Sequence, residues 1–415
     1  MRKVLVVGAG QAGLQLALGL VGRGYDVTVM SARTPEEIRA GRVMSTQCMF
    51  GPALRHERDL ELNLWEERTP RIGGLGLSVG APADDGGHRR VLNWLGLLDE
   101  HAQSVDQRVK MAGWLELLED RGGKVVYHGV TTSDLDALTS LYDLVVVAAG
   151  KGELVEAFTR DPGRSPYRTP QRVLAVAYVH GMAPRPEHPD VPAVRFNAVP
   201  GVGELFAIPG FTLSGPCDIL FFEGLPGGPL DCWDDRPGPA EHLDRTLSLM
   251  RRFVPWEHER CREVELTDAH ATLVGAYAPV VREPVATLPS GGRVLGMADV
   301  VVANDPITGQ GSNNAARCAA SYLDSIVARG DRPFDEEWMR GAFEAYWEHA
   351  RHATSWTNAM LRPPPDHVMR IFGAALESPA VARRFVNCFA DPSDLEGWFY
   401  DPELADRYLT SVTGG

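Results

Sequence analysis

The sequence predicts an α/β protein: a parallel-sheet domain interleaved with an antiparallel β-rich lobe and completed by a helical C-terminus. Three observations predict this class. The chain opens with a strand–helix–strand order, its middle changes to strand-like runs between Pro and Gly turns, and helical spacing of apolar side chains dominates after residue 336. A length of 415 residues allows two or three domains.

The N-terminal segment predicts the start of a Rossmann-like domain. The apolar run Lys3–Val7 indicates a buried parallel strand. Apolar spacing over Gln11–Val21 predicts a helix that ends near Gly22, and Tyr25–Met30 is the next strand. This strand–helix–strand order is the repeating unit of parallel sheets.

The later elements follow from the same two periodicities, 3.6 residues for helices and 2 for strands. Helices are predicted over Arg108–Arg121, Ser312–Arg329, Glu336–His352 and Asp366–Phe389. Strands are predicted over Lys124–His128, Leu144–Ala149, Val173–Val179, Ile219–Phe222 and Arg293–Gly296. No strong helix is expected between Val173 and Glu223, so this region forms the antiparallel lobe.

Composition argues against several classes of function. A formal net charge of −14 with scattered Lys and Arg disfavours nucleic-acid binding, which needs a basic face. No apolar stretch has the length of a membrane helix, and no signal-peptide cleavage site follows the basic start. The six cysteines form no CxxC, and the histidines form no metal-binding pattern. We expect a cytoplasmic protein without metal, nucleic acid or membrane contact.

The turn between the first strand and helix carries the dinucleotide-binding pattern GxGxxG. Its residues are Gly8, Ala9, Gly10, Gln11, Ala12 and Gly13. The first glycine permits the tight turn, the second lets a pyrophosphate approach the backbone, and the third lets the helix pack on the strand. The strand–turn–helix context makes this pattern specific for an FAD or NAD cofactor.

The usual ribose-binding carboxylate is absent from this unit. An Asp or Glu is expected at the end of the second strand, about twenty residues after the glycines. The strand ends instead in Val29-Met30-Ser31-Ala32-Arg33. Either Ser31 and Arg33 hold the adenosine end loosely, as an exchanging cofactor requires, or the ribose partner comes from elsewhere in the chain.

Two later strand ends complete a flavin site. The apolar strand Leu144–Ala149 ends at Gly150, which allows close passage of a dinucleotide. After Arg293–Gly296 comes Asp299, whose carboxylate can accept from ribityl hydroxyls. The next turn opens a helix whose free N–H groups favour the negative charge of reduced flavin. Its candidate contacts are Pro306, Gly309, Gln310, Gly311, Ser312 and Asn313.

With these motifs in this order, the chain resembles the flavin monooxygenases of the hydroxybenzoate-hydroxylase fold. Among them it looks most like the oxygenase components of styrene and indole monooxygenases. The resemblance covers nearly the whole chain. Besides the glycine turns it includes Gly41-Arg42-Val43, Val105-Asp106-Gln107-Arg108, Arg121-Gly122-Gly123-Lys124, Thr169-Pro170-Gln171-Arg172 and Trp356-Thr357-Asn358. The Trp-Thr-Asn triplet and the missing ribose carboxylate favour this branch over the single-component hydroxylases.

The resemblance implies both a domain organisation and a reaction. It assigns 1–72, 99–165 and 286–332 to a Rossmann-like FAD-binding domain, 73–98 and 166–285 to a substrate domain, and 333–415 to C-terminal helices. Such enzymes take FADH₂ from a separate NAD(P)H:flavin reductase, form a C4a-peroxide with O₂, and epoxidise or hydroxylate an alkene or indole. The substrate would be a small apolar aromatic or indole, and the chain could form a homodimer.

The chemistry rests with the cofactor, so we expect no catalytic base, acid or nucleophile from the protein. His56 and Glu57 are expected on a solvated helix face. Arg42 and Arg108 are candidates for contacts with the flavin, a surface salt bridge being the alternative for each. The substrate-pocket candidates are Ser45, Leu77, Phe196, Phe206 and Thr308.

Two departures from the family pattern bear on the substrate and the cofactor. Ser45 stands where the styrene enzymes have Asn, and Ala298 stands where Gly usually precedes the aspartate. The segment Gly73–Gly80 has small or aliphatic side chains where the styrene enzymes are rich in aromatics, which predicts a roomier cavity unless other aromatics such as Phe221 refill it.

Three other functions are considered. The first is a single-component NAD(P)H-dependent aromatic hydroxylase on the same fold, which the sequence does not exclude. A flavin-dependent halogenase is disfavoured because no Trp-x-Trp-x-Ile-Pro stretch is present. A flavin-binding redox sensor has no appended DNA-binding or signalling segment to support it.

Overall fold

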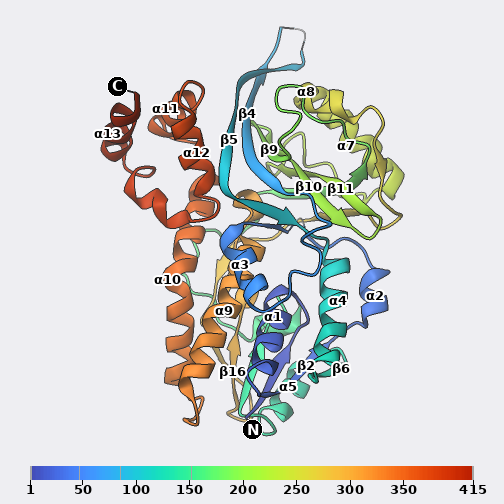
Figure 1. Ribbon diagram of the computed structural model, residues 1–415, viewed down its shortest axis with the longest axis vertical. Helices are drawn as coiled ribbons and strands as arrows, with labels where there is room; N and C mark the ends of the chain where they lie inside the picture. Colours follow the sequence, from blue (N-terminus) through green and yellow to red (C-terminus); the bar gives the residue numbers. More distant parts are fainter. Residues whose placement is uncertain (1, 46, 85, 151, 414–415) are drawn as a thin grey trace.

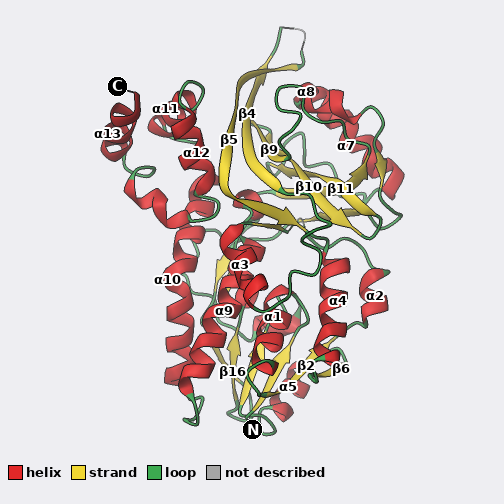
Figure 2. Ribbon diagram, in the orientation of Figure 1, coloured by secondary structure: helices red, strands yellow, loops and turns green. Residues whose placement is uncertain are grey.

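The computed structural model describes residues 2–45, 47–84, 86–150 and 152–413. Two β-sheets and a helical layer organise the chain (Figure 1). The lower half holds a parallel sheet with helices on its faces, the upper half holds a large curved sheet, and the last helices flank both (Figure 2). The predicted α/β class with an antiparallel lobe and a helical C-terminus is confirmed.

The parallel sheet has the strand order β15-β16-β7-β1-β2-β6, in which only β15 is antiparallel to its neighbour. Its strands are β1 (Lys3–Val7), β2 (Asp26–Ser31), β6 (Lys124–Tyr127), β7 (Leu144–Val147), β15 (Val285–Thr287) and β16 (Arg293–Gly296). β7 is buried at every position and β1 at all but Lys3, as expected when helices cover both faces of a sheet. The strands come from three distant parts of the chain.

Helices cover this sheet from both sides. The main ones are α1 (Gln11–Val21), α4 (Gln107–Asp120), α9 (Gly311–Arg329) and α10 (Glu336–Met360), and the short ones are α2 (Pro35–Arg39), α3 (Gly51–Asp59), α5 (Thr132–Leu138) and α6 (Glu153–Glu156). α1 packs along α9, where the Gln15 side chain donates to the Ala316 carbonyl at 3.1 Å. Because α1 follows β1 and α9 follows β16, both helices start near the carboxyl ends of the parallel strands.

The second sheet runs β12-β8-β11-β10-β9-β4-β5-β3, with β13 also paired to β8. Its strands are β3 (Cys48–Met49), β4 (Ile72–Pro82), β5 (His88–Ser104), β8 (Val173–His180), β9 (Ala193–Val199), β10 (Gly203–Thr212), β11 (Gly215–Gly224), β12 (Glu265–Leu266) and β13 (Thr272–Gly275). Two-residue strands β14 (Val280–Val281) and β17 (Val302–Ala303) pair separately. All pairings in the large sheet are antiparallel except β4 with β9.

Helix α7 (Pro239–Phe253) and the short α8 (Pro255–His258) cover the outer face of the large sheet. The sequence interpretation missed α7, which lies within the segment expected to be β-rich. Leu243, Leu247 and Met250 recur at helical spacing after Gly238 and Pro239, so the helical signal was present in the sequence and was overlooked. β5 also continues to Ser104, beyond the strand segment 73–98.

The C-terminal layer differs from prediction in two places. α10 continues to Met360 rather than ending at His352, because Ala353, Trp356 and Thr357 bury its extra turns. The predicted helix Asp366–Phe389 is two helices, α11 (Asp366–Ala374) and α12 (Pro379–Asn387). Pro379 cannot continue a helix from its N-terminal side, so it begins a new one. α13 (Pro402–Thr413) ends the layer.

Candidate active site

The glycine turn between β1 and α1 has the shape of a pyrophosphate cradle. Gly8 has φ +118°, and a Cβ there would lie 2.7 Å from the Ala148 carbonyl carbon. A Cβ on Gly13 would lie 2.2 Å from the Gly8 oxygen, so the helix start needs glycine. A Cβ on Gly10 would meet no atom within 4 Å. Open space at the second glycine is where the pyrophosphate is expected.

The first turn of α1 offers backbone donors to this space. Gly10 precedes the helix and no side chain caps it, so the leading N–H groups point toward the cradle. The Gln11 side chain is buried, and its amide donates to Gln15 at 3.1 Å and to Glu57 at 3.0 Å. Ala12 is buried as well. Gln11 and Ala12 are therefore placed to bind phosphate through backbone N–H groups, not side chains.

The surroundings of Glu57 were predicted wrongly. Glu57 does not lie on a solvated helix face: it is 2% exposed and forms a buried ion pair with Lys110 of α4. Lys110 also lies 4.9 Å from the centre of the Trp114 ring. Burial lowers the pKa of Lys110, and the Glu57 carboxylate opposes that effect. Because the Gln11 amide donates to Glu57, the Glu57–Lys110 pair helps to fix the start of α1 at the glycine turn. No local sequence pattern indicates this role.

The end of β2 holds the two residues predicted near the ribose. The Ser31 hydroxyl donates to the Arg33 carbonyl at 2.6 Å and is buried. Arg33 is exposed, and its guanidinium lies 3.1 Å from the Met44 sulfur. Arg42 is exposed in the following loop. Ser31 is thus occupied in a local turn, whereas Arg33 and Arg42 have room to meet a ligand.

Gly150 and Asp299 meet where β7 and β16 end side by side. A Cβ on Gly150 would lie 2.9 Å from the Asp299 Cβ, so only glycine allows this approach. Asp299 is exposed within the short 3₁₀ turn Ala298–Val300. Ala298 has φ +50°, a left-handed conformation that favours glycine. The positive φ at this position explains why glycine is common there in the family.

The turn before α9 is held open by its own side chains. Asp305 accepts from the Ile307 N–H at 3.1 Å, and Gly309 has φ +62°. Asn313 accepts from the Phe50 N–H at 2.9 Å and donates to the Cys48 and Gly309 carbonyls.

The remaining predicted residues of this turn divide into buried and exposed positions. Gln310 donates to the Thr308 and Phe389 carbonyls. Pro306 is half-buried, Ser312 is half-buried just inside the helix, and a Cβ at Gly311 would meet nothing within 4 Å. No side chain caps α9, so its N–H groups face open space.

Arg108 is placed inside the protein rather than at the cradle. Its side chain is 1% exposed and donates to Asp106 at 2.9 Å, to both oxygens of Asp268 at 3.0 and 2.9 Å, and to Thr212 at 3.2 Å. The remaining N–H reaches the Gly41 carbonyl at 3.3 Å. With its guanidinium donors engaged, Arg108 ties both halves of the molecule together and is poorly placed to contact a flavin directly.

A cavity of about 280 Å³ lies between the large sheet and the C-terminal helices. Leu77 of β4 and Phe196 of β9 line it, together with Val368, Phe372 and Phe385 from α11 and α12. Phe206 stacks on Phe196 with ring centres 4.6 Å apart, and Phe221 stacks on Phe206 at 5.7 Å. Neighbouring aromatics thus replace part of the bulk that the small side chains of β4 lack.

Ser45 and Thr308 lie outside the lining of this cavity. The Tyr178 hydroxyl donates to the Ser45 carbonyl. The Thr308 hydroxyl is buried 2.5 Å from the Thr357 hydroxyl, which gives the Trp-Thr-Asn triplet a direct contact with the turn before α9. Leu77 and Phe196 are therefore brought together at the cavity, while Ser45 and Thr308 lie toward the parallel-sheet domain.

Buried carboxyl groups lie between the apolar cavity and the turn before α9. Arg172 and Glu204, which both line the cavity, form an ion pair of 2.7 Å. Glu204 lies opposite Glu223 in the sheet, and Glu223 is fully buried, with no hydrogen-bond partner for its carboxyl oxygens among the described residues. Burial raises the pKa of Glu223 well above its usual range, and Asp305 raises it further.

Comparison with known proteins shows the family of the chain. Residues 150–260 match the family model described as "Styrene monooxygenase A putative substrate binding domain". Styrene monooxygenase StyA of Pseudomonas fluorescens is 31% identical over 98% of this chain and 97% of that protein. The chain belongs to the styrene monooxygenase family. A second styrene monooxygenase StyA, from Pseudomonas sp, is 30% identical over 99% of this chain and 98% of that protein.

Solved structures share the fold of this styrene monooxygenase family member. A flavoprotein/dehydrogenase from Cytophaga hutchinsonii has a TM-score of 0.62 at 15% identity, covering 100% of this chain and 98% of its own. The p-nitrophenol 4-monooxygenase of Pseudomonas putida has a TM-score of 0.62 at 14% identity, covering 94% and 99%. These comparisons confirm the predicted family, an FAD-dependent monooxygenase activity and FAD as cofactor.

The residues of this styrene monooxygenase family member fit FAD. The open space at Gly10, the uncapped starts of α1 and α9 and the close passage at Gly150 provide backbone donors and room along one sheet edge. No helix in the described ranges is long and apolar enough to cross a bilayer.

Proposed function

We propose that the chain is the oxygenase component of a two-component monooxygenase. It would receive reduced FAD from a separate NAD(P)H:flavin reductase and use O₂ to epoxidise or hydroxylate an alkene or indole-type substrate. One observation carries the proposal: the cradle has donors for the pyrophosphate and flavin, but β2 ends at Ser31 without a ribose carboxylate. A cofactor anchored weakly at its adenosine end can exchange between proteins.

Bound reduced FAD would supply the two electrons that activate O₂, so that one oxygen atom of O₂ enters the substrate and the other leaves as water. The chain's own part is to hold the cofactor and position the substrate. The uncapped N-terminus of α9 at Gly311 and Ser312 favours the negative charge of the reduced ring by about 0.3–2 kcal/mol. This preference for the reduced form suits a protein that captures it from solution.

The apolar cavity has the chemistry to hold the substrate. Leu77, Phe196 and Phe372 offer apolar contact to such a substrate. An apolar lining also excludes water, which would otherwise react with or decompose the activated oxygen species before the substrate does. Arg172 and Glu204 add polar atoms to the lining, which suits a substrate with one polar group such as an indole N–H.

The proposal is tested by separating reduction from oxygenation. Purified protein, FAD, NADH or NADPH and indole or styrene are mixed with catalase, and an unrelated flavin reductase is added later. Product is expected only after the reductase, because the chain is not expected to take electrons from a nicotinamide itself. Heat-inactivated reductase is the control. NAD(P)H oxidation by the protein alone, stimulated by substrate, would instead support the single-component hydroxylase.

A further inference from the structure

A second cavity of about 280 Å³ lies on the opposite face of the large sheet. It is covered by the loop 181–192 between β8 and β9 and bordered by Arg260 beyond α8. Arg195 of β9 lines it, whereas the next residue, Phe196, lines the apolar cavity. Neighbouring residues of a strand point to opposite faces. The two cavities therefore lie back to back across one strand.

Arg195 is a buried cation without a partner in this cavity. Its side chain is 3% exposed, and across the described residues it forms no ion pair and no hydrogen bond. The guanidinium lies over Gly76 of β4, where an added Cβ would come 2.4 Å from an arginine nitrogen. Ala193 and Ala207 also border the cavity, so small side chains leave open space beside the charge.

The neighbouring charges do not neutralise Arg195. Glu257 is fully buried and is shared by Arg185 at 3.1 Å and Arg260 at 2.5 Å. Glu187 pairs with Arg90 and lies 3.7 Å from Arg185.

Asp218 is the remaining carboxyl at the cavity wall, near Arg260. Four guanidinium groups thus face three carboxyls, and at least one positive charge is left over. Burial, followed by repulsion from Arg185, lowers the pKa of Arg195 to about 10. Burying an unpaired charge lowers the stability of the folded state, so binding of an external anion would stabilise it.

We propose that this cavity binds a small anion carrying a carboxylate or phosphate group, with Arg195 as its main ligand. Arginine suits both groups because its planar fork donates two parallel hydrogen bonds. Arg185 and Arg260 would add charge from the covering loop and from the end of α8. The site goes beyond the proposed oxygenase function, since no residue of the flavin cradle takes part. Occupancy would bear on substrate binding through Phe196, the next residue of β9.

The test uses the full chain saturated with FAD, so that the flavin cradle cannot take the probe. Thermal unfolding is measured with inorganic phosphate and, separately, succinate, each against chloride at equal ionic strength. A tenfold excess over Kd is expected to raise Tm by about 1–3 °C. The shift should vanish in Arg195→Met and persist in Arg23→Met, an exposed arginine in the turn after α1. Which probe acts distinguishes the phosphate from the carboxylate.

The stability of the anion-free variant and the stoichiometry of anion binding provide two further tests. Without anion, Arg195→Met should unfold at the same or a higher temperature than the wild type, because it removes an unpaired buried charge. Calorimetric titration of the wild type should show one site for phosphate or succinate even if the variant does not fold. Equal Tm shifts in the wild type and Arg195→Met, or no binding of either anion at millimolar concentration, would overturn the site.

Discussion

Substitutions at the individual glycines of the cradle should affect either cofactor binding or folding. At Gly10 an added Cβ meets no protein atom, whereas at Gly13 it collides with the Gly8 carbonyl. Gly10→Val should therefore fold but fill the space of the pyrophosphate, weakening FAD binding on the order of 100-fold. Fluorescence titration with FAD measures the loss, and circular dichroism confirms the fold. Unchanged affinity in the folded variant would remove this turn from the cofactor site.

Ala298 offers a second test at the scale of one residue. Its φ of +50° places a Cβ in the left-handed region beside Asp299. Ala298→Gly should raise the free energy of unfolding by about 0.5–1 kcal/mol, since relief of the strained conformation outweighs the added chain entropy. Denaturant unfolding measures the change. Ala149→Gly, whose φ is not positive, is the control and should be neutral or destabilising.

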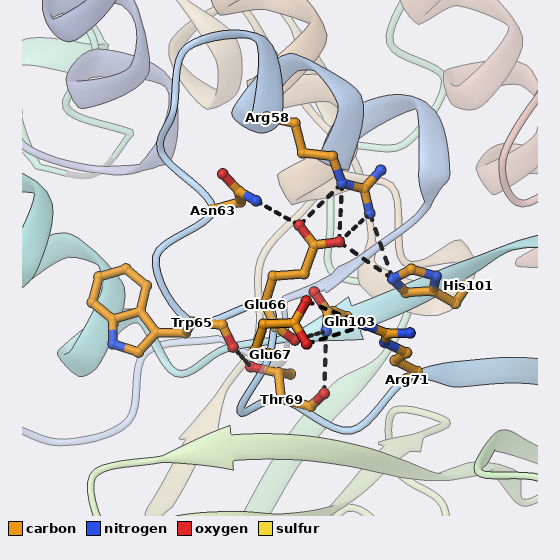
Figure 3. A network of polar contacts seen from close by, with 9 residues as sticks. All are labelled: Arg58, Asn63, Trp65, Glu66, Glu67, Thr69, Arg71, His101 and Gln103. Carbon is orange, nitrogen blue, oxygen red and sulfur yellow. Dashed lines mark hydrogen bonds and ion pairs between the residues drawn. The ribbon is translucent and has the colours of Figure 1, made fainter.

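At the scale of elements, a polar network fastens the loop between α3 and β4 (Figure 3). Glu66 accepts from Arg58 at 2.6 Å and from Asn63 at 2.6 Å, and His101 of β5 lies 3.6 Å away. Gln103 of β5 donates to the Glu66 and Thr69 carbonyls. The loop that joins the parallel-sheet domain to the large sheet is thus held against β5.

This network predicts an acid-sensitive contribution to stability. Hydrogen bonding from Arg58 lowers the pKa of Glu66 from 4.5 to about 2. A lowered pKa stabilises the fold above pH 4.5, and the contribution is lost as pH falls toward 2. Glu66→Gln should cost about 1–3 kcal/mol at pH 7 and progressively less below pH 4.5.

Urea unfolding across pH 2–7 measures that dependence on the network. The matched control is Glu67→Gln, which removes an exposed ion pair with Arg71 of 3.3 Å and should change stability by less than about 0.5 kcal/mol. A pH-independent difference between the wild type and Glu66→Gln would mean that the carboxylate charge is not what fastens the loop.

At the scale of the whole molecule, the proposed substrate cavity lies where the large sheet meets the C-terminal helices. Leu77→Phe would fill part of this cavity from β4, so we expect kcat/KM to fall by about tenfold for 3-methylindole and less for styrene. Product formation with added reductase measures both. Leu97→Phe, on the exposed side of β5, is the control. A wild-type preference for styrene over larger indoles would count against the roomier cavity.

Sequence patterns predicted those parts of the molecule that are local in the chain. Lys3–Val7, Gln11–Val21 and the glycines between them follow from periodicity and turn geometry, and the helix and strand have these bounds in the structure. The contacts of Glu57 with Lys110 and of Arg108 with Asp268 join residues far apart in the chain. No periodicity reports such pairs, because only the packed fold brings them together.

The interleaved order of the parallel sheet has a consequence for how the protein is made. β1 is translated long before β16, which its sheet needs to be complete, and the helix start proposed to face the flavin follows at Gly311. At cellular elongation rates that interval is on the order of 15–60 s. In the later part of this interval β7 presents an unpaired edge, so we expect the nascent chain to be prone to aggregation until β16 pairs with it.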